Sequence, residues 1–298
     1  MKPLSWLNKA EYPFQSHIFP TPQGDMHYVD EGCGDPIVFV HGNPSWSFQF
    51  RNLIKLLSKN YRCIAPDLIG FGLSDKPADW SYLPRDHADI LEKFLDSLDL
   101  HSITLVVGDW GGPIGLSYAL NHPDKISLLV ITNTWLWSVR NDWHYQIFSK
   151  FVGGVIGGWL IKKRNFFARD IVQAAFGDKR KLTSEIHNHY LAPLANPDER
   201  KGTWIFPREI IGSSDWLHSL WTQADILSTK NILIAWGMKD MAFRERELNR
   251  WIQRYPNAQV IRYPDAGHFV TEEKASEVAG EIYQILHRQT MSEDSHSR

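Results

Sequence analysis

The sequence has little cysteine and no dominant charge. Only Cys33 and Cys63 occur among 298 residues, and neither sits at the spacing of a metal-ligand or redox pair. We therefore expect two inert, reduced thiols and a cytoplasmic protein. Lys and Arg total 32 against 34 Asp and Glu, a formal charge of −2. This balance argues against nucleic acid as a partner, because nucleic-acid-binding proteins carry a basic surface.

The sequence also lacks a long apolar run. Residues 1–14 contain no apolar signal-peptide core. The most membrane-like stretch is residues 151–161, followed by the basic residues 162–164. It is too short to span a bilayer, which takes about 20 residues. We interpret it as a buried or pocket-lining helix rather than an interfacial or oligomer contact, and homo-oligomer formation is left open.

Short apolar runs alternate with helical patterns over most of the chain. Strands are expected at residues 16–19, 26–30, 37–40, 61–65, 105–107, 126–132, 232–237 and 258–263, and a closing helix at 272–288. Several of these strands are continuously apolar, as strands buried on both faces are. The alternation predicts an α/β fold with a mostly parallel sheet flanked by helices.

The strand pattern is interrupted between residues 133 and 228, where apolar residues recur at helical spacing. We predict a helical cap at 133–228, inserted after the sixth strand. Residues 1–132 and 229–290 then form the core domain, and 291–298 a flexible tail. Large aromatic residues of the cap are expected to shape an apolar pocket. They are Trp135, Trp137, Phe148, Phe151, Phe166, Phe167 and Phe176.

Residues 105–120 predict a strand that turns sharply into a helix through small residues. This is the layout of a nucleophile elbow, which places the side chain at the bend in a cavity. Asp109 occupies the bend, where serine is usual. A carboxylate needs no base to activate it, so the reaction would begin with carboxylate attack on carbon. The stretch alone is equally consistent with Asp109 as the N-cap of the helix.

Three further polar residues follow predicted strands: Asn43, Asp240 and, in the loop after the last strand, His268. Ligands of open parallel sheets bind at the carboxyl ends of the strands. Taken singly, Asp240 is consistent with a turn residue and His268 with an ordinary loop histidine, one of 13. Together with Asp109 they follow the chain order of a hydrolase triad: nucleophile, acid, histidine. The joint fit favours the triad.

Four short segments carry a family resemblance. They are His-Gly-Asn-Pro at 41–44, Pro-Asp-Leu-Ile-Gly-Phe-Gly-Leu-Ser at 66–74, Gly-Asp-Trp-Gly-Gly at 108–112 and Gly-His-Phe at 267–269. With them, about residues 15–288 resemble the haloalkane dehalogenase family, which has the α/β-hydrolase fold. The resemblance implies that Asp109 is the nucleophile and His268 the base. It also implies that the side chains of Trp110 and Asn43 bind the halide.

The position of the third triad residue divides the family. One subfamily has a glutamate after the sixth strand, where this chain reads Thr-Asn-Thr at 132–134. The others have an aspartate after the seventh strand, which matches Asp240. The combination of Asn43 with Asp240 resembles the third subfamily. Gly108 precedes the nucleophile where better-known relatives carry His or Gln, and the sequence does not say what this changes.

The reaction that these residues imply converts a small apolar haloalkane to a primary alcohol, halide and a proton. Asp109 attacks carbon and forms an alkyl ester, while neutral N–H donors stabilise the departing halide. His268, oriented by Asp240, then activates water against the ester. The backbone N–H groups of Asn43 and Trp110 hold the resulting oxyanion. No metal or organic cofactor is required.

Three alternatives remain. Epoxide hydrolases share the same triad but need a phenol donor from the cap, for which Tyr145 and Tyr190 are the candidates; Asn43 favours halide over epoxide. Fluoroacetate dehalogenases carry Arg residues around the nucleophile, whereas Trp110 and two glycines follow Asp109. A binding protein without catalysis would not require the nucleophile, the acid and the base together.

Overall fold

The computed structural model describes residues 4–296, with side chains described through residue 289. Within that range eight strands form one sheet in the order β1-β2-β4-β3-β5-β6-β7-β8. The pairs β1–β2 and β2–β4 are antiparallel, and all other neighbours are parallel. The strands are β1 Ser16–Thr21, β2 Gly24–Glu31, β3 Pro36–Val40, β4 Arg62–Pro66, β5 Ile103–Val107, β6 Ile126–Thr132, β7 Asn231–Gly237 and β8 Gln259–Tyr263. The predicted mostly parallel sheet is confirmed.

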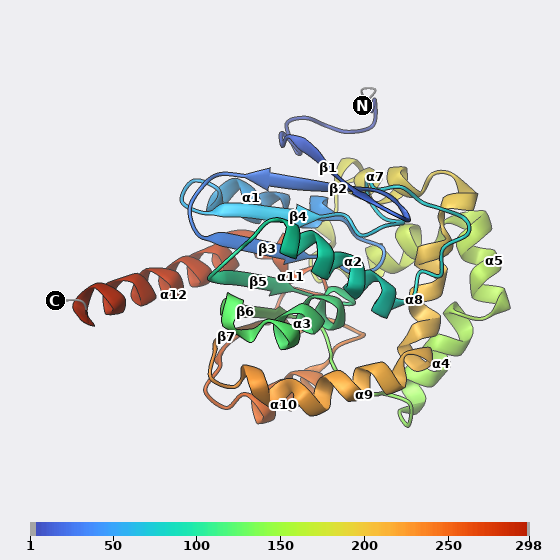
Figure 1. Ribbon diagram of the computed structural model, residues 1–298. Helices are drawn as coiled ribbons and strands as arrows, with labels where there is room; N and C mark the ends of the chain where they lie inside the picture. The colour runs from blue at the N-terminus through green and yellow to red at the C-terminus, as the bar shows by residue number, and fades with distance from the viewer. Residues whose placement is uncertain (1–3, 297–298) are drawn as a thin grey trace.

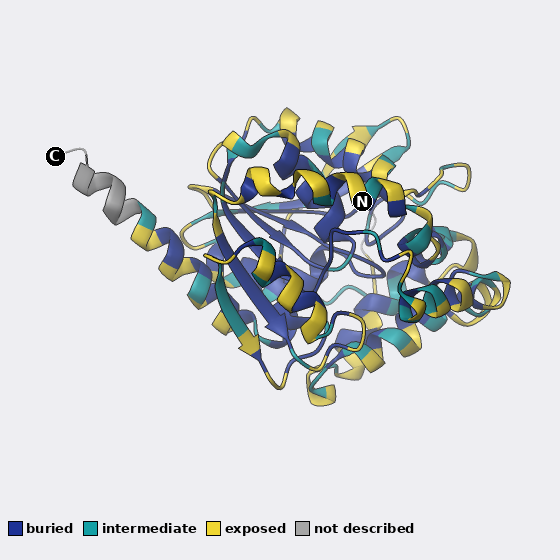
Figure 2. Cartoon of the chain, turned by 90° about the horizontal axis from the view of Figure 1, so that it is seen from below, coloured by how far each residue is buried: buried dark blue, intermediate teal, exposed yellow. Residues whose placement is uncertain are grey.

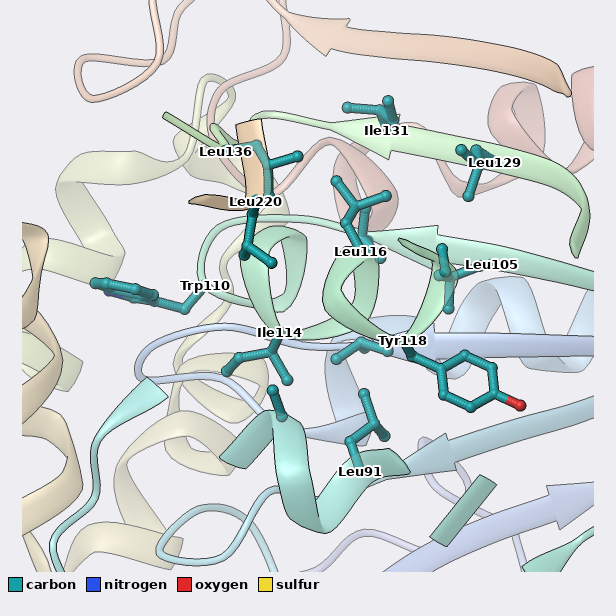
Figure 3. Packing of buried hydrophobic residues seen from close by; sticks show 14 of the residues in the cluster. Leu91, Leu105, Trp110, Ile114, Leu116, Tyr118, Leu129, Ile131, Leu136 and Leu220 are labelled. Atoms are coloured by element: carbon teal, nitrogen blue, oxygen red, sulfur yellow. The ribbon is translucent and has the colours of Figure 1, made fainter. Parts of the chain in front are cut away.

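Helices cover both faces of this sheet (Figure 1), and the strands between them are buried (Figure 2). One face packs against helices α2, α3 and α10, and the other against α1, α11 and α12. Their bounds are α1 Arg51–Leu57, α2 Pro84–Ser97, α3 Gly111–Asn121, α10 Glu245–Arg254, α11 Val270–Glu273 and α12 Ala275–His296. Side chains alternate across a strand, so Leu105 of β5 packs with Leu91 and Ile114 (Figure 3), whereas Val106 belongs to the opposite core. This explains the continuously apolar strands.

Only helices and turns lie between β6 and β7 within the described chain. The helices are α4 Trp143–Val152, α5 Val155–Arg164, α6 Val172–Ala175, α7 Ser184–Leu191, α8 Lys201–Gly212 and α9 Ser214–Gln223. Most of this helical insertion lies at one end of the sheet, and α12 projects from the other end (Figure 1). The prediction of helices inserted after the sixth strand is confirmed.

The prediction that residues 151–161 form a buried or pocket-lining helix is wrong for most of the run. Within α5 only Gly157 and Ile161 are buried. Val155, Ile156 and Trp159 are 88%, 65% and 58% exposed. The reason is that α5 packs against α4 and α8 along one side only, and these three side chains occupy the other side.

The chain end differs from the expected one as well. Helix α12 continues to His296, past the predicted end at residue 288 and through most of the segment expected to be a tail. Residues 297–298 of that segment lie outside the described residues.

Candidate active site

Asp109 occupies a sharp turn between β5 and α3. Its φ is +48°, in the left-handed region where a residue with a side chain is strained and which active-site residues often adopt. Gly111 permits the turn, because a Cβ there would clash with the carbonyl oxygen of Val40. The backbone N–H of Asp109 donates to Asn133 O at 3.0 Å, and Thr134 Oγ1 donates to Asp109 O at 2.5 Å. The segment that follows β6 therefore holds the bend.

Two backbone N–H groups point at the Asp109 carboxylate. That of Asn43 donates to Oδ1 at 2.7 Å, and that of Trp110 also hydrogen-bonds the carboxylate. Burial raises the pKa of Asp109, although His268 and the two N–H groups act in the opposite direction. The side chain is 20% exposed and lines a cavity. These two N–H groups can stabilise negative charge on an oxygen of the Asp109 carboxyl group.

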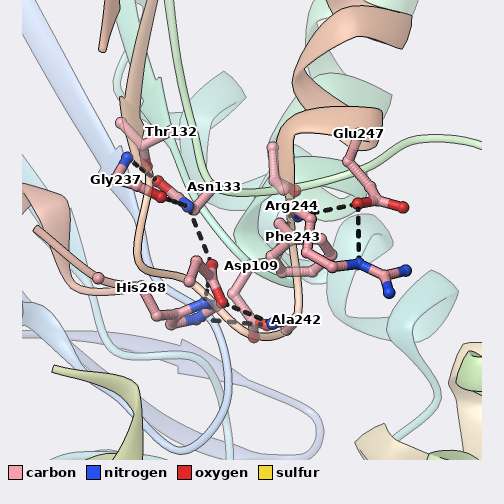
Figure 4. Close-up of polar contacts among 12 residues, drawn as sticks. Asp109, Thr132, Asn133, Gly237, Ala242, Phe243, Arg244, Glu247 and His268 are labelled. Carbon is pink, nitrogen blue, oxygen red and sulfur yellow. Dashed lines mark hydrogen bonds and ion pairs between the residues drawn. The ribbon is translucent and has the colours of Figure 1, made fainter. Parts of the chain in front are cut away.

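His268 lies between the other two predicted triad residues. Its Nδ1 donates to Asp240 Oδ2 at 2.8 Å, and its Nε2 is 3.7 Å from Asp109 Oδ2. The ring of Phe243 stacks on the imidazole with centroids 5.7 Å apart (Figure 4). Burial alone lowers the pKa of His268, but Asp240 and Asp109 outweigh it and raise the pKa to about 9. The structure thus brings together the three residues that the sequence placed far apart.

Asn133, which the sequence analysis did not select, supports the acid of this group. Its Nδ2 donates to Asp240 Oδ2 at 2.9 Å and to Gly237 O at 3.0 Å, and its Oδ1 accepts from Gly237 N at 2.8 Å (Figure 4). Asp240 Oδ1 accepts from Ala242 N at 2.7 Å. The sequence held a sign of this role, because Asn133 directly follows β6, in the segment where the resemblance led us to look for an acid.

Glu273 was also missed, and it joins the His268 loop to the helical insertion. Its carboxylate is buried and accepts from Gly267 N at 2.8 Å, Gly177 N at 3.1 Å and Asp178 N at 2.7 Å. Next to it, His268 N donates to Ala175 O at 2.9 Å. A glutamate within a helical run gave no sign of this role, because its partners are backbone groups from a distant segment.

The side-chain donors predicted to bind halide both line the cavity. The indole Nε1 of Trp110 donates to no acceptor within the described part of the chain, although the residue is only 1% exposed. The amide of Asn43 makes one long contact, Nδ2 to Thr203 O at 3.4 Å. Both side chains therefore have N–H groups that can donate to a molecule bound in the cavity.

The cavity has a volume of about 230 Å³. Of the seven aromatic residues predicted to shape it, Trp135, Phe148 and Phe167 contribute to the lining. The other four do not, because Trp137 packs on Trp221 and Trp251, Phe151 is 50% exposed, Phe176 stacks on Phe269, and Phe166 lies outside the lining. The remaining lining is mostly apolar and includes Pro44, Ile171, Val172, Ala175, Pro207, Ile210, Met241 and Ala242.

Neither candidate phenol for epoxide opening is available in this arrangement. Tyr145 lines the cavity, but its hydroxyl donates to Ala242 O at 2.9 Å. Tyr190 is fully buried, lies outside the cavity lining, and donates to Glu272. Both hydroxyls are thus committed to other acceptors.

Gly108 has a structural explanation. A Cβ at this position would lie 2.5 Å from Thr132 Oγ1, and that hydroxyl donates to Val107 O at 2.9 Å. Any side chain at 108, including the His or Gln of relatives, requires Thr132 to move. Glycine at 108 therefore allows Thr132 to keep its hydrogen bond to Val107.

Comparison with known proteins places this chain in a family. Residues 35–275 match the alpha/beta hydrolase fold family model. Haloalkane dehalogenase 2 of Mycobacterium tuberculosis is 36% identical over 91% of this chain and 94% of its own. The chain belongs to the haloalkane dehalogenase family. It also resembles the cis-3-alkyl-4-alkyloxetan-2-one decarboxylase of Shewanella oneidensis, with 37% identity over 94% of this chain and 90% of that protein.

Solved structures agree with this placement. A haloalkane dehalogenase from Bradyrhizobium elkani superposes with a TM-score of 0.82 and 27% identity, over 92% of this chain and 99% of that one. A putative ancestral haloalkane dehalogenase gives a TM-score of 0.80 and 29% identity, over 90% and 99%. The relatives thus share the whole fold, including the insertion.

Proposed function

We propose that the protein hydrolyses small haloalkanes to a primary alcohol, halide and a proton, with Asp109, His268 and Asp240 as catalytic residues. The observation that carries the proposal is the Asp109 carboxylate at the floor of an apolar cavity, with His268 Nε2 only 3.7 Å away. We assign the insertion at 133–228 as a cap over this cavity. Asn43 with Asp240 supports membership of the third subfamily.

In the first step a carboxylate oxygen of Asp109 attacks the halogen-bearing carbon. The carbon–halogen bond breaks as the carbon–oxygen bond forms, and the product is an alkyl ester. The departing halide is held by the side-chain N–H groups of Trp110 and Asn43, which are effective because the lining of the cavity is mostly apolar. No proton moves in this step, and His268 is not required for it.

In the second step water attacks the ester carbonyl carbon of Asp109. Neutral His268 takes the proton of the water, and Asp240 stabilises the imidazolium that forms. The backbone N–H groups of Asn43 and Trp110 already lie on this carboxylate and hold the oxyanion. Collapse breaks the bond between the carbonyl carbon and the alkoxy oxygen, and that oxygen takes the second proton of the water and leaves as the alcohol. The Asp109 carboxylate is restored, and the imidazolium releases its proton to solvent.

Esterification also changes the charge beside His268. The negative charge of Asp109 raises the pKa of His268 in the free protein. The alkyl ester is neutral, so the pKa of His268 falls when the intermediate forms. The imidazole thereby becomes a base at the stage of the reaction that requires one.

A trapping experiment tests the nucleophile and the base. We expect H268A to form the ester with 1-bromobutane and to be unable to hydrolyse it. Intact mass and peptide mapping should then find one butyl group on Asp109, and the double variant D109A/H268A, as the control, should acquire none. An unmodified H268A after incubation would overturn this mechanism.

Two assays distinguish dehalogenation from epoxide hydrolysis: bromide release from 1-bromobutane and diol formation from styrene oxide. We expect bromide release alone, because the hydroxyls of Tyr145 and Tyr190 already donate to Ala242 and Glu272. Diol formation without bromide release would favour the epoxide hydrolase.

The 37% identical decarboxylase supports a second candidate, the decarboxylation of an oxetan-2-one. Attack of Asp109 at ring carbon 4 would break the ring carbon–oxygen bond and leave a carboxylate on carbon 3. Loss of CO₂ from carbon 3, with departure of Asp109 from carbon 4, forms the alkene and restores the enzyme. This route uses no water, so H268A should lose steady-state bromide release and retain alkene formation. The wild type would then form alkene from an oxetan-2-one, measured by gas chromatography, and release no bromide from 1-bromobutane. That result would favour decarboxylation as the function.

A further inference from the structure

Six large apolar side chains on the outer surface of α4 and α5 are exposed, and we name them the α4–α5 face. They are Trp143 at 72%, Ile147 at 60%, Phe151 at 50%, Val155 at 88%, Ile156 at 65% and Trp159 at 58% exposure. Large patches of this kind are rare on monomeric soluble proteins and mark interaction sites. The two helices lie in contact with each other, at the edge of the insertion (Figure 1).

The sequence of α4 explains why one helix carries two apolar sides. Trp143, Ile147 and Phe151 recur every four residues and form one stripe. Tyr145 and Phe148 occupy other sides of the helix and line the cavity. The α4–α5 face is therefore separated from the substrate cavity by the thickness of a single helix.

The helices of the α4–α5 face carry positive charge, although Asp142 at the N-cap of α4, Asp170 and Asp198 lie beside them. Residues 143–169 contain five cationic side chains and no Asp or Glu, although the whole chain has a net charge of −2. The cations are Lys150, Lys162, Lys163, Arg164 and Arg169. Lys162 pairs with Asp198 at 2.9 Å, an exposed contact of small energetic value.

We propose that the α4–α5 face binds the surface of a bilayer that contains anionic lipid. Exposed Trp, Phe and Ile beside Lys and Arg are the composition of a helix that lies in the interface plane. No helix in residues 4–296 is long and apolar enough to cross a bilayer. Contact with a second copy through a two-fold axis is disfavoured, because it would bring the same cationic segment of both copies together.

This position has a consequence for the proposed substrate class, although the inference itself does not depend on the reaction. Met241 is 62% exposed and lines the cavity, so it marks an opening. The neighbouring Ala242 accepts a hydrogen bond from Tyr145 of α4, so the opening adjoins the helix that carries the face. Apolar substrates concentrate in bilayers, and the bound protein would take them up there.

Vesicle flotation of the full-length protein tests the proposal. We expect the protein to float with vesicles of phosphatidylcholine mixed with phosphatidylglycerol, and to do so less at high salt. The double variant V155D/W159D should lower the partition coefficient about tenfold or more, because it removes two inserted side chains and adds negative charge. The matched control is I226D, at a side chain 47% exposed in the turn Ala224–Leu227.

A second variant separates charge from apolar contact. K162E/K163E should weaken binding to the mixed vesicles and leave the weaker binding to pure phosphatidylcholine unchanged. Melting temperatures and bromide release of all variants should match the wild type, because the substituted side chains are exposed. Failure of the wild type to float with mixed vesicles, or equal flotation of V155D/W159D, would overturn the proposal. So would a dimer, seen by light scattering, that V155D/W159D dissociates.

Discussion

The two walls of the cavity are built in opposite ways. On the sheet side Asp109, Asp240 and His268 are held by short hydrogen bonds to backbone groups and to Asn133. On the insertion side Phe148, Phe167 and Ile210 offer only apolar contact. Hydrogen bonds have strict geometry and apolar packing tolerates change. The sheet side is therefore suited to fix the chemistry, and the insertion to vary the substrate.

The largest expected effect tests the sheet side. D109G should lower bromide release by at least about 10⁴-fold, since it removes the proposed nucleophile. It should leave the melting temperature equal or higher, because glycine adopts the φ of +48° without strain. The control is D99G, an exposed residue with a φ of +47°, which should keep full activity. Calorimetry that shows D109G to be much less stable would argue against strain at the bend.

Asn133 tests whether the sheet side acts as one unit. N133A removes three buried hydrogen bonds, which should lower the free energy of unfolding by about 2–4 kcal/mol. Ester hydrolysis should slow about 10- to 100-fold, because Asp240 loses a partner that orients it, while alkylation of Asp109 keeps its rate. Rapid-quench measurement of both steps checks this, with exposed Asn141→Ala as the control. Equal slowing of the two steps would indicate a general structural role.

The pH dependence of ester hydrolysis tests the charge coupling between Asp109 and His268. The proposed base is the neutral imidazole of His268, so the hydrolysis rate should rise about tenfold per pH unit and become constant above the pKa. This apparent pKa should lie below the value of about 9 in the free protein, because the ester has no charge. Quench-flow rates compared with an NMR titration of unliganded His268 check the difference. A hydrolysis pKa equal to that of the free protein would contradict the coupling.

The smallest effect tests the connection between the two walls. E273Q keeps one carbonyl acceptor, and its NH₂ group opposes either the N–H of Asp178 or, with the amide turned over, the N–H groups of Gly177 and Gly267. We expect about 1–3 kcal/mol less stability and a few-fold slower hydrolysis. E277Q, at a side chain 52% exposed, is the control. If E273Q behaves like E277Q, the two walls do not depend on this carboxylate.

The sequence predicted the sheet side of the molecule better than the insertion side. The fold followed from continuously apolar strands, which are typical of a parallel sheet covered on both faces. The grouping of Asp109, Asp240 and His268 followed from the rule that ligands bind at the carboxyl ends of such strands. Glu273 was missed because its partners are backbone groups of distant segments, and Asn133 was missed because only the fold brings it to Asp240 and Gly237. The exposed side of α5 was predicted wrongly. Apolar residues are expected to be buried, but the packing of α5 against α4 and α8 leaves its other side uncovered.

The pairing of Gly108 with Thr132 constrains how this site can diverge. A side chain at 108 would lie 2.5 Å from the Thr132 hydroxyl, so the His or Gln of relatives requires that hydroxyl to turn away from Val107. Serine at 132 would keep the oxygen and the clash, whereas alanine would remove both the clash and the hydrogen bond to Val107. A lineage that changes residue 108 would therefore give up this hydrogen bond, either by rotating the Thr132 side chain or by replacing the threonine. The two positions should vary together among descendants of this sequence.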